Sequence, residues 1–259
     1  MAFCQPAEVV RSERVTPSMI RVRLRAVGEW RWHIDGRGDE RVDLAFPRPG
    51  ETRADVAFFN DREYGTASRN EEPPWRHYTV RAVHDGGREL DIDFVVHDGG
   101  LASGWAERAA PGEVLGVFHG GTSRAYHVPP ADTAWQLLVA DATGLPGLAR
   151  IIEELPADAE VHAVVEVPSE ADRQVIPSLA RVSWTWIVGT GGLESALPAA
   201  VEALTLPAGV GYVWVACEAA AARRVRKHVR EVRGLGRERH RAVGYWTAGT
   251  TGHVEQDRD

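Results

Sequence analysis

The segment WQLLVADATGLPGLARIIEEL, residues 135–155, decides the fold class of this chain. Its first six residues, Trp135 to Ala140, form a short apolar run of the kind that makes a buried strand. After a polar turn, a helical pattern extends from Leu145 to Leu155, with Pro146 in the first turn, where proline is favoured. A buried strand that leads directly into a helix predicts a β-α-β unit.

The same rhythm continues towards the C-terminus. We expect further strands at Glu160–Val167, Ser183–Val188, Gly211–Ala216 and His240–Trp246, and helices at Glu194–Leu204 and Glu218–Arg233. Alternating strands and helices predict a parallel, doubly wound sheet, whose ligands bind at the carboxyl ends of the strands. The tryptophans within these strands, Trp184, Trp186 and Trp214, are expected in the core.

Before Pro129-Pro130 the pattern is mostly strands. Apolar and charged residues alternate in the run from Met19 to Val27, and Tyr78–Val96 reads as a hairpin around a Gly-rich turn. The polar segment Arg48–Pro74 is expected to be a long loop or a partly ordered excursion. The sequence therefore predicts an N-terminal antiparallel β-barrel, residues 1–128, followed by a C-terminal α/β domain with a doubly wound parallel sheet, residues 129–259.

Composition excludes several classes of protein. The chain has 259 residues and a net charge of −7, which disfavours general nucleic-acid binding. The N-terminus is too charged for a signal peptide and no apolar run could span a bilayer, so we expect a cytoplasmic protein without stable membrane insertion. We also expect a monomer. The two cysteines, Cys4 and Cys217, are expected to be reduced, and Cys217 to be a packing residue. The spacing of the histidines predicts no metal site, and no catalytic triad is expected.

Residues 76–81 read RHYTVR and combine two guanidinium groups, a phenol ring and a hydroxyl on one expected strand. Alternation places Arg76, Tyr78 and Val80 on one face and His77, Thr79 and Arg81 on the other. Arginine binds phosphate oxygens bidentately, tyrosine can stack on a ring, and threonine can bond a heterocycle edge. The pattern therefore indicates a site for a flat anionic ligand. An arginine-rich strand with a packing tyrosine is the structural alternative.

A second candidate lies at residues 97–103, HDGGLAS, where a strand is expected to end and a helix to run to Ala110. Gly100 and Ser103 would give this junction free backbone N–H groups, a serine cap and the positive end of a helix dipole, which suit a pyrophosphate. A glycine turn with a serine cap is also an ordinary strand-to-helix junction.

Four motifs, in order, resemble the siderophore-interacting protein family of flavoproteins in the ferredoxin-reductase superfamily. They are the Arg-x-Tyr-Thr-x-Arg strand from Arg76; the run with His97, Ala102, Ser103 and Trp105; the turn with Asp141, Thr143, Leu145 and Pro146; and Trp214 to Glu218 with Gly244-Tyr245-Trp246. The chain departs from the family pattern at Ala142, Cys217 and Thr247, where the family has Glu, Gly and often a basic residue.

The resemblance implies an FAD-dependent ferric-siderophore reductase that takes electrons from NADPH or NADH and holds no metal of its own. The residues it implies for cofactor binding are Arg76, His77, Tyr78, Thr79, Arg81, His97, Gly100, Ala102, Ser103, Asp141 and Thr143. Glu218, Arg223 and Trp246 are implied for substrate binding. No side chain is expected to act as a catalytic acid or base, because the flavin carries the chemistry.

Two other functions stay open on the sequence. One is a flavin-dependent oxidoreductase on the same scaffold with an acceptor other than iron, and the other is a non-catalytic siderophore-binding accessory protein. The role of the basic side of the expected helix Glu218–Arg233 is equally open. This side carries Arg223, Arg226, Lys227 and Arg230, and the opposite side carries Ala222, Val225, Val229 and Val232. The basic side is either a solvated surface or a cationic wall for a 2′-phosphate or an acidic iron chelate.

Overall fold

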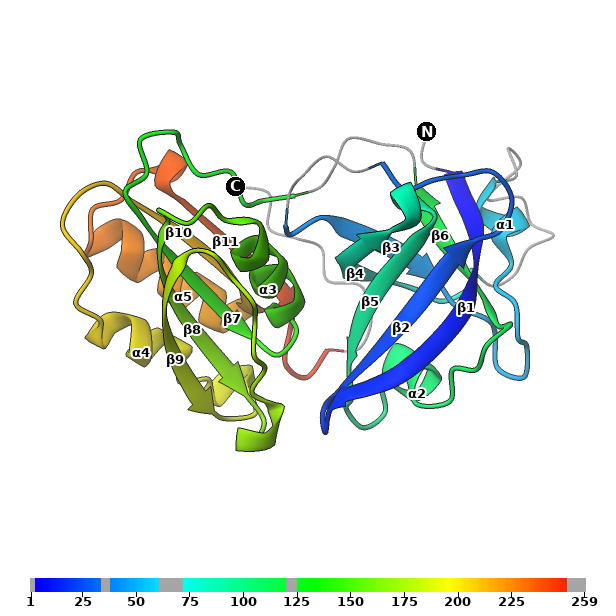
Figure 1. Ribbon diagram of the computed structural model, residues 1–259. Helices are drawn as coiled ribbons and strands as arrows, with labels where there is room; N and C mark the ends of the chain where they lie inside the picture. The colour runs from blue at the N-terminus through cyan, green and yellow to red at the C-terminus, as the bar shows by residue number, and fades with distance from the viewer. Residues whose placement is uncertain (1–2, 34–37, 61–71, 120–124, 251–259) are drawn as a thin grey trace. The chain divides into compact units, whose positions relative to one another are not determined.

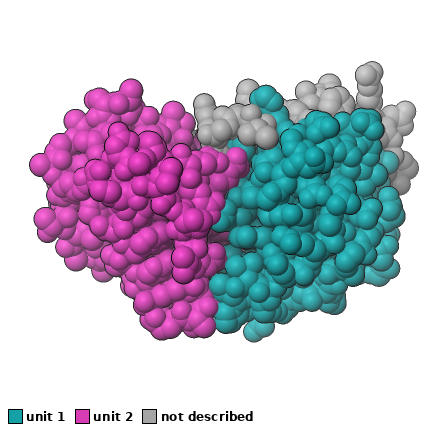
Figure 2. All heavy atoms as spheres, in the orientation of Figure 1, with its two compact units in different colours: residues 1–124 teal, residues 125–259 magenta. Residues whose placement is uncertain are grey.

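The computed structural model describes residues 3–33, 38–60, 72–119 and 125–250. The chain forms two compact units, residues 1–124 and residues 125–259, which are coloured separately in Figure 2. The two family motifs upstream of residue 125 lie in the first unit, and the other two lie in the second.

The first unit is a closed antiparallel barrel with strand order β1-β2-β5-β4-β3-β6, as the sequence predicts (Figure 1). Its strands are β1 (Phe3–Thr16), β2 (Met19–Ala26), β3 (Arg41–Ala45), β4 (Trp75–His84), β5 (Glu89–Val95) and β6 (Val114–His119). Two short helices accompany them, α1 (Val56–Asn60) and α2 (Leu101–Ala106). Pairing of β1 with β6 closes the barrel.

Alternation along β2 and β5 separates the barrel core from its surface. The apolar residues Ile20, Val22 and Leu24 are buried opposite Phe94, Ile92 and Leu90. Each such side chain contributes about 1.5–3 kcal/mol when fully buried. The residues between them form a ladder of ion pairs on the other face, Arg21–Asp93, Arg23–Asp91 and Arg25–Glu89, with hydrogen bonds of 2.7–2.8 Å.

The segment Arg48–Pro74 contains the short helix α1, which agrees with the second alternative, a partly ordered excursion. The side chain of Asn60 fixes this helix to β1: its Nδ2 donates to the backbone oxygen of Cys4, and its Oδ1 accepts from the Cys4 N–H. These long-range bonds supply an order that turn-rich local sequence does not show. Residues 61–71 of the expected loop lie outside the described residues.

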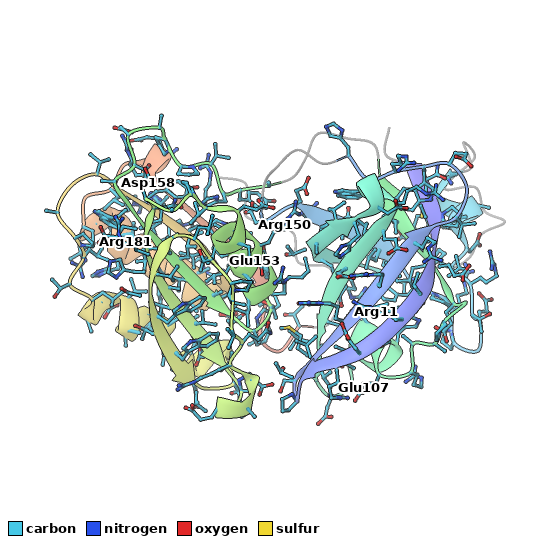
Figure 3. The ribbon with its side chains drawn as sticks, in the orientation of Figure 1. Arg11, Glu107, Arg150, Glu153, Asp158 and Arg181 are labelled. Carbon is cyan, nitrogen blue, oxygen red and sulfur yellow. The ribbon has the colours of Figure 1, made fainter. Side chains whose placement is uncertain are left out.

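The second unit is a parallel five-stranded sheet with order β11-β10-β7-β8-β9, again as predicted (Figure 1). Its strands are β7 (Trp135–Asp141), β8 (Glu160–Val167), β9 (Arg181–Val188), β10 (Gly211–Glu218) and β11 (His240–Trp246). Its helices are α3 (Leu145–Glu154), α4 (Leu197–Ala203) and α5 (Ala219–Glu231). Arg181 fixes the start of β9 by donating to the backbone oxygen of Asp158, 3.1 Å away (Figure 3).

Helices cover both faces of this sheet, with α4 and α5 on one side and α3 on the other (Figure 1). Val201 of α4 and Val225 of α5 pack in one core with Val139 and Val215 of the two central strands. Because the chain leaves β7 and β10 towards opposite edges, their carboxyl ends form the switch point where such sheets bind ligands.

Three expectations for this unit are corrected. Helix α4 begins at Leu197 and not at Glu194, because Ser195 bonds elsewhere before the helix starts. Trp214 is fully buried as expected, but Trp184 and Trp186 are half-exposed and stacked on each other, with ring centroids 5.2 Å apart. They lie on β9, an edge strand, and apolar sequence alone does not show which strand is at the edge.

The third correction concerns the end of α5. The helix ends at Glu231 and not at Arg233, and Val232 is 70% exposed, so it is no part of the apolar stripe. Gly234, with φ of 70°, allows the chain to turn back, and the N–H of Leu235 donates to the Val229 carbonyl. This turn takes Val232 away from the sheet.

Candidate functional site

Strand β4 presents the first candidates on the inner side of the barrel. Arg76 pairs with Leu44 and Tyr78 with Val42, and both partners are buried in the barrel core. Opposite residues of an antiparallel pair share a face. Val80 is also in this core, so the predicted common face of Arg76, Tyr78 and Val80 is confirmed.

The ring of Tyr78 is held by other aromatic side chains. Its centroid lies 4.5 Å from that of Phe94 and 6.4 Å from that of Phe46. Burial raises the pKa of the Tyr78 hydroxyl above its ordinary value, and the positive charge of Arg76 acts in the opposite direction. The phenol is therefore neutral at physiological pH, and its half-exposed ring is fixed in place.

The two arginines of the motif have different surroundings. Arg81 is buried, with its Nε 3.9 Å from Oδ2 of Asp93, which also binds Arg21. Arg76 is half-buried and donates from Nη1 to the backbone oxygen of Trp75, 2.7 Å away. Among the described residues no carboxylate pairs with Arg76. Arg76 is thus the arginine with charge and donors left for an anion, whereas Arg81 belongs to the ion-pair ladder.

His77 and Thr79 lie on the other face of β4. The His77 ring contacts the carboxylate of Asp43 through Nδ1, and Thr79 is buried. The strand has an irregularity, but it falls between Val80 and Ala82 and does not turn Thr79 towards the Tyr78 side. A contact between Thr79 and a ligand that stacks on Tyr78 would therefore use the backbone.

The turn after β5 is fastened by Ser103. The N–H of His97 donates to Ser103 Oγ, and that hydroxyl donates back to the His97 carbonyl, both at 2.9 Å. The expected serine cap is wrong: the N-cap residue is Gly100, without a side-chain cap bond. The helix also ends at Ala106 and not at Ala110. The hydroxyl cannot cap α2 because it holds the strand end against the helix.

Other side chains of this turn also face the protein. A Cβ on Gly100 would lie 2.4 Å from Nε2 of His97, so the exposed imidazole closes over the glycine. Ala102 and Trp105 belong to the barrel core. What this turn offers a ligand is therefore backbone, because the first-turn N–H groups of a helix have no intrahelical acceptor.

In the second unit, Asp141 is the centre of a buried hydrogen-bond network at the carboxyl end of β7. Its Oδ1 accepts from the Thr143 N–H at 2.8 Å, the Thr143 hydroxyl at 2.6 Å and the Gly144 N–H at 3.2 Å. Its Oδ2 accepts from the Glu218 N–H at 2.9 Å and Trp246 Nε1 at 2.7 Å. Burial raises the pKa of Asp141, and these bonds oppose that rise.

Two residues expected to bind substrate are bonded into the same edge. Glu218 is buried and caps α5, because its Oε2 accepts from the N–H groups of Ala220 and Ala221 at 2.6 and 3.1 Å. The ring of Trp246 lies beside Gly191, where an added Cβ would be 3.5 Å from Cζ2. The carboxyl edge thus joins the ends of β7, β10 and β11 through motif residues.

Arg223 and Cys217 lie apart from that network. Arg223 is exposed on α5, and no carboxylate in the described part of the chain pairs with it. Cys217 is fully buried in the core beneath α4 and α5, which agrees with its expected packing role. Burial and the nearby charge of Asp141 raise the pKa of its thiol well above the ordinary range.

Sequence reasoning missed a second buried carboxylate, Glu166, near the end of β8. Its Oε2 accepts from the Ser195 hydroxyl at 2.6 Å and Oε1 from the Ala196 N–H at 3.3 Å. A Cβ on Gly189 would lie 2.2 Å from Oε1, so only glycine fits over it. A glutamate inside an apolar strand was the available signal, followed by the glycine-rich run after β9.

Neither a metal centre nor a membrane span is found in the described residues. No group of three or more His, Cys, Asp or Glu side chains there could hold a metal ion, and no helix there is long and apolar enough to cross a membrane.

Comparison with known proteins gives matches over almost the whole chain. A sequence model described as a siderophore-interacting FAD-binding domain matches residues 8–123, and one described as a siderophore-interacting protein matches residues 133–249. The NADPH-dependent ferric-chelate reductase of Escherichia coli K12 is 33% identical over 248 residues, which are 93% of this chain and 91% of that protein.

Solved structures agree with this match. A siderophore utilization protein from T. fusca is 34% identical, covers 98% of this chain and 96% of its own, and superposes with a TM-score of 0.82. The ferredoxin reductase in carbazole 1,9a-dioxygenase has a TM-score of 0.63 at 15% identity, over 95% of this chain and 70% of its own, and shares the fold.

Proposed function

Because the chain belongs to the siderophore-interacting protein family, we propose that it is an FAD-dependent ferric-siderophore reductase that uses NADPH. The family match and the reductase relative make it a flavoprotein oxidoreductase in siderophore metabolism. NADPH as the donor is proposed from the name of the Escherichia coli relative, and the ferric siderophore is its proposed substrate. A bound flavin would accept a hydride and release electrons singly to Fe(III).

The barrel residues fit FAD in chemistry. Tyr78 provides a neutral aromatic ring that is half-exposed and rigidly packed on Phe94. Arg76, two residues away on the same face, provides a guanidinium for a phosphate. The backbone of the Gly100–Ser103 turn provides N–H donors for the same anion, with Ser103 fixing the turn from inside.

The lone charge of Arg76 is the observation that carries this proposal. The arginines of β2 are bonded to carboxylates of β5, as Arg21 is to Asp93, and Arg81 of β4 lies 3.9 Å from that same carboxylate. A half-buried cation without such a partner costs desolvation and is expected where a ligand supplies the negative charge. Arg81, His77 and Thr79 would then support the strand, with Thr79 reaching the flavin only through its backbone.

At the sheet edge, we propose that Asp141 positions the turn at Thr143 and Gly144 to receive the nicotinamide nucleotide. Its carboxylate already accepts five hydrogen bonds, so it orients backbone N–H groups and does not itself hold a phosphate. Trp246 would offer a ring face. Glu218 would act through the cap of α5, and Arg223 would offer a cation to an acidic chelate.

Substitution of the two motif arginines tests the flavin site. Removing a charge-assisted hydrogen bond costs about 1.5–3 kcal/mol, so Arg76→Ala should weaken FAD binding about tenfold to a hundredfold in titrations of apoprotein. Arg81→Ala is the matched control: it removes the same charge from the same strand but should lower stability rather than FAD affinity. Equal FAD affinities for Arg76→Ala and wild type would reject the assignment.

The reaction is tested by anaerobic reduction and reoxidation. NADPH should bleach the flavin, and ferric siderophores should then restore its colour faster than buffer does. Bleaching without accelerated reoxidation by any ferric chelate would favour an acceptor other than iron. A yellow protein that NADPH and NADH fail to bleach would favour the accessory role or another electron donor. A colourless protein that takes up no FAD would end the proposal.

The monomeric state and the cytoplasmic location also stay proposals. Size-exclusion chromatography with light scattering should give the mass of one 28.4 kDa chain, and a dimer mass would contradict it. Cell fractionation tests the location.

A further inference from the structure

Positive charge is concentrated in one segment of the second unit. Residues 223–241 contain nine of the 30 Lys and Arg residues and only two of the 37 Asp and Glu residues. This segment therefore carries +7, while the rest of the chain carries −14. Such segregation produces a strong field on one side of a protein that is acidic elsewhere.

The charges lie on the outer face of α5 and the turn that follows. The apolar stripe of the helix, with Val225 and Val229, is buried in the sheet core. Arg223, Arg224 and Lys227 are exposed on the other side. A helix of 13 residues is about 20 Å long, so this surface is wider than a small anion.

Internal ion pairs do not account for this surface. Arg239 is paired with Asp132, and Arg230 with Glu231. Within the described residues, no carboxylate pairs with Arg223, Arg224 or Lys227. Arg237, in the turn after α5, is exposed as well.

Helix stability does not account for it either. The helix dipole favours cations only in the last turn, whereas Arg223 and Arg224 lie in the first half of α5. Arg223 and Lys227 are four residues apart, as are Arg226 and Arg230, and like charges at this spacing destabilise a helix. The row of cations therefore opposes the stability of the helix that carries it.

We propose that the part of this basic surface formed by Arg224, Lys227 and Arg237 binds the anionic headgroups of a lipid bilayer, while Arg223 remains the cation for the acidic chelate. A surface row of basic residues is attracted to a leaflet rich in anionic lipid, and the acidic remainder of the chain would orient the protein with α5 towards it. The apolar stripe is already in the core, so binding is peripheral and reversible. This inference goes beyond the proposed reductase and does not depend on flavin chemistry.

The chemistry of the segment favours lipid over a protein or nucleic acid. Residues 219–241 contain no Phe, Trp, Tyr or Met. Protein interfaces have aromatic and Met anchors beside Arg, and single-stranded nucleic acids stack on aromatic rings. Val232 is the one exposed large apolar side chain in residues 219–241, and a row of Arg and Lys with so little apolar surface matches a diffuse anionic surface.

Co-sedimentation of the FAD-loaded full chain with vesicles tests the proposal. We expect binding to vesicles of phosphatidylcholine and phosphatidylglycerol, none to phosphatidylcholine alone, and release at about 1 M salt. Each cation near the surface is worth about a fivefold change in binding. The triple variant Arg224→Gln/Lys227→Gln/Arg237→Gln should therefore bind about a hundredfold more weakly.

A control variant with the same change in net charge separates this surface from overall charge. Arg11→Gln/Arg14→Gln/Arg108→Gln removes three exposed cations from the first unit, where Figure 3 labels Arg11 on β1, and should bind like wild type. Circular dichroism and FAD content would show that both variants are folded. Equal weakening in the two variants would overturn the proposal, as would equal binding of wild type to both kinds of vesicle. Binding to soluble poly-glutamate but not to vesicles would instead identify an acidic protein partner.

Discussion

Replacing Asp141 with asparagine isolates the role of the hydrogen-bond network at the sheet edge. The aspartate accepts five hydrogen bonds, three at Oδ1 from Thr143 and Gly144 and two at Oδ2 from Glu218 and Trp246. Asparagine has nearly the same shape but one acceptor atom and one donor group. Its NH₂ would face at least two N–H donors whichever way the amide is turned.

The cost follows from those two donors. With the amide oxygen towards Thr143, the N–H of Glu218 and Nε1 of Trp246 both lose a charged acceptor in a buried place. Hydrogen bonds to a charged group contribute about 1.5–3 kcal/mol each. Burial penalises the charged carboxylate and so raises the pKa of Asp141. The neutral asparagine does not have this desolvation penalty, which offsets part of the lost stability. We therefore expect Asp141→Asn to lower the free energy of unfolding by about 3 kcal/mol, a large part of a typical total of about 5–15 kcal/mol.

Urea unfolding followed by helical ellipticity is the appropriate assay, because α3, α4 and α5 all lie in the second unit. Trp246→Phe removes one of the two donors. In a double-mutant cycle, the loss in Asp141→Asn/Trp246→Phe should be smaller than the sum of the single losses by about 1 kcal/mol or more.

Asp132→Asn is the matched control, because it makes the same exchange at an exposed carboxylate that binds Arg239. It should leave the unfolding midpoint nearly unchanged. A loss below about 1 kcal/mol for Asp141→Asn, or strict additivity with Trp246→Phe, would refute the reasoning.

Two further predictions concern a glycine and a surface ladder. Gly144→Ala should destabilise the second unit by about 1–3 kcal/mol, because the added Cβ would lie 2.0 Å from the carbonyl oxygen of Ala216. Gly104→Ala is the control, since its added Cβ would lie 3.5 Å from Nη1 of the flexible Arg108 side chain. It should be neutral or stabilising in the same urea titration. Burial alone would raise the pKa of Asp91, but hydrogen bonds from Arg23 and His84 together outweigh it and hold the pKa below its usual value. Its contribution to stability should be present above the unfolded pKa of about 3.9 and be lost as pH falls through the lower folded value. Asp91→Asn should therefore be less stable than wild type at neutral pH and approach it below about pH 4, and a constant gap across that range would contradict this.

Sequence periodicity predicts the regular elements where local pattern and burial agree. The strands Glu160–Val167 and His240–Trp246 are found with the expected bounds. Glu160–Val167 is mostly buried, and an apolar run of this length is typical of a covered parallel sheet. His240–Trp246 is a partly buried edge strand, and the alternation of strands and helices predicts it. The barrel follows in the same way from alternation in its strands.

Errors arise where distant residues decide the local structure. The local sequence allows Ser195 to be part of α4, but its hydroxyl donates a hydrogen bond to Glu166 on β8. Ser103 could have capped α2, but it bonds His97. A serine hydroxyl can form a hydrogen bond with any of several nearby groups, and the sequence does not show which of them the fold brings within reach. The half-exposed stack of Trp184 on Trp186 likewise depends on strand order, which places β9 at the edge of the sheet.

The candidate site shows a further limit. The motif identifies Arg76 and Arg81 as equals, and only the structure shows that the second is buried beside Asp93. Similarly, Asp141 and Trp246 are 105 residues apart in sequence, and their hydrogen bond depends on the parallel arrangement of β7, β10 and β11. Long-range pairing of side chains is a property of topology, which a pattern of residue types does not contain.

The two units therefore use their motif residues differently, and this difference can be measured. Polar groups already bonded within the protein, as in Asp141, affect stability first, whereas a cation with no internal carboxylate, as in Arg76, affects ligand affinity first. We expect Asp141→Asn to unfold more easily while its folded form binds FAD as wild type does, and Arg76→Ala to show the reverse. Titration of both apoproteins with FAD, beside their urea unfolding curves, gives all four quantities. A tenfold loss of FAD affinity in folded Asp141→Asn would show that the sheet edge also contributes to the flavin site.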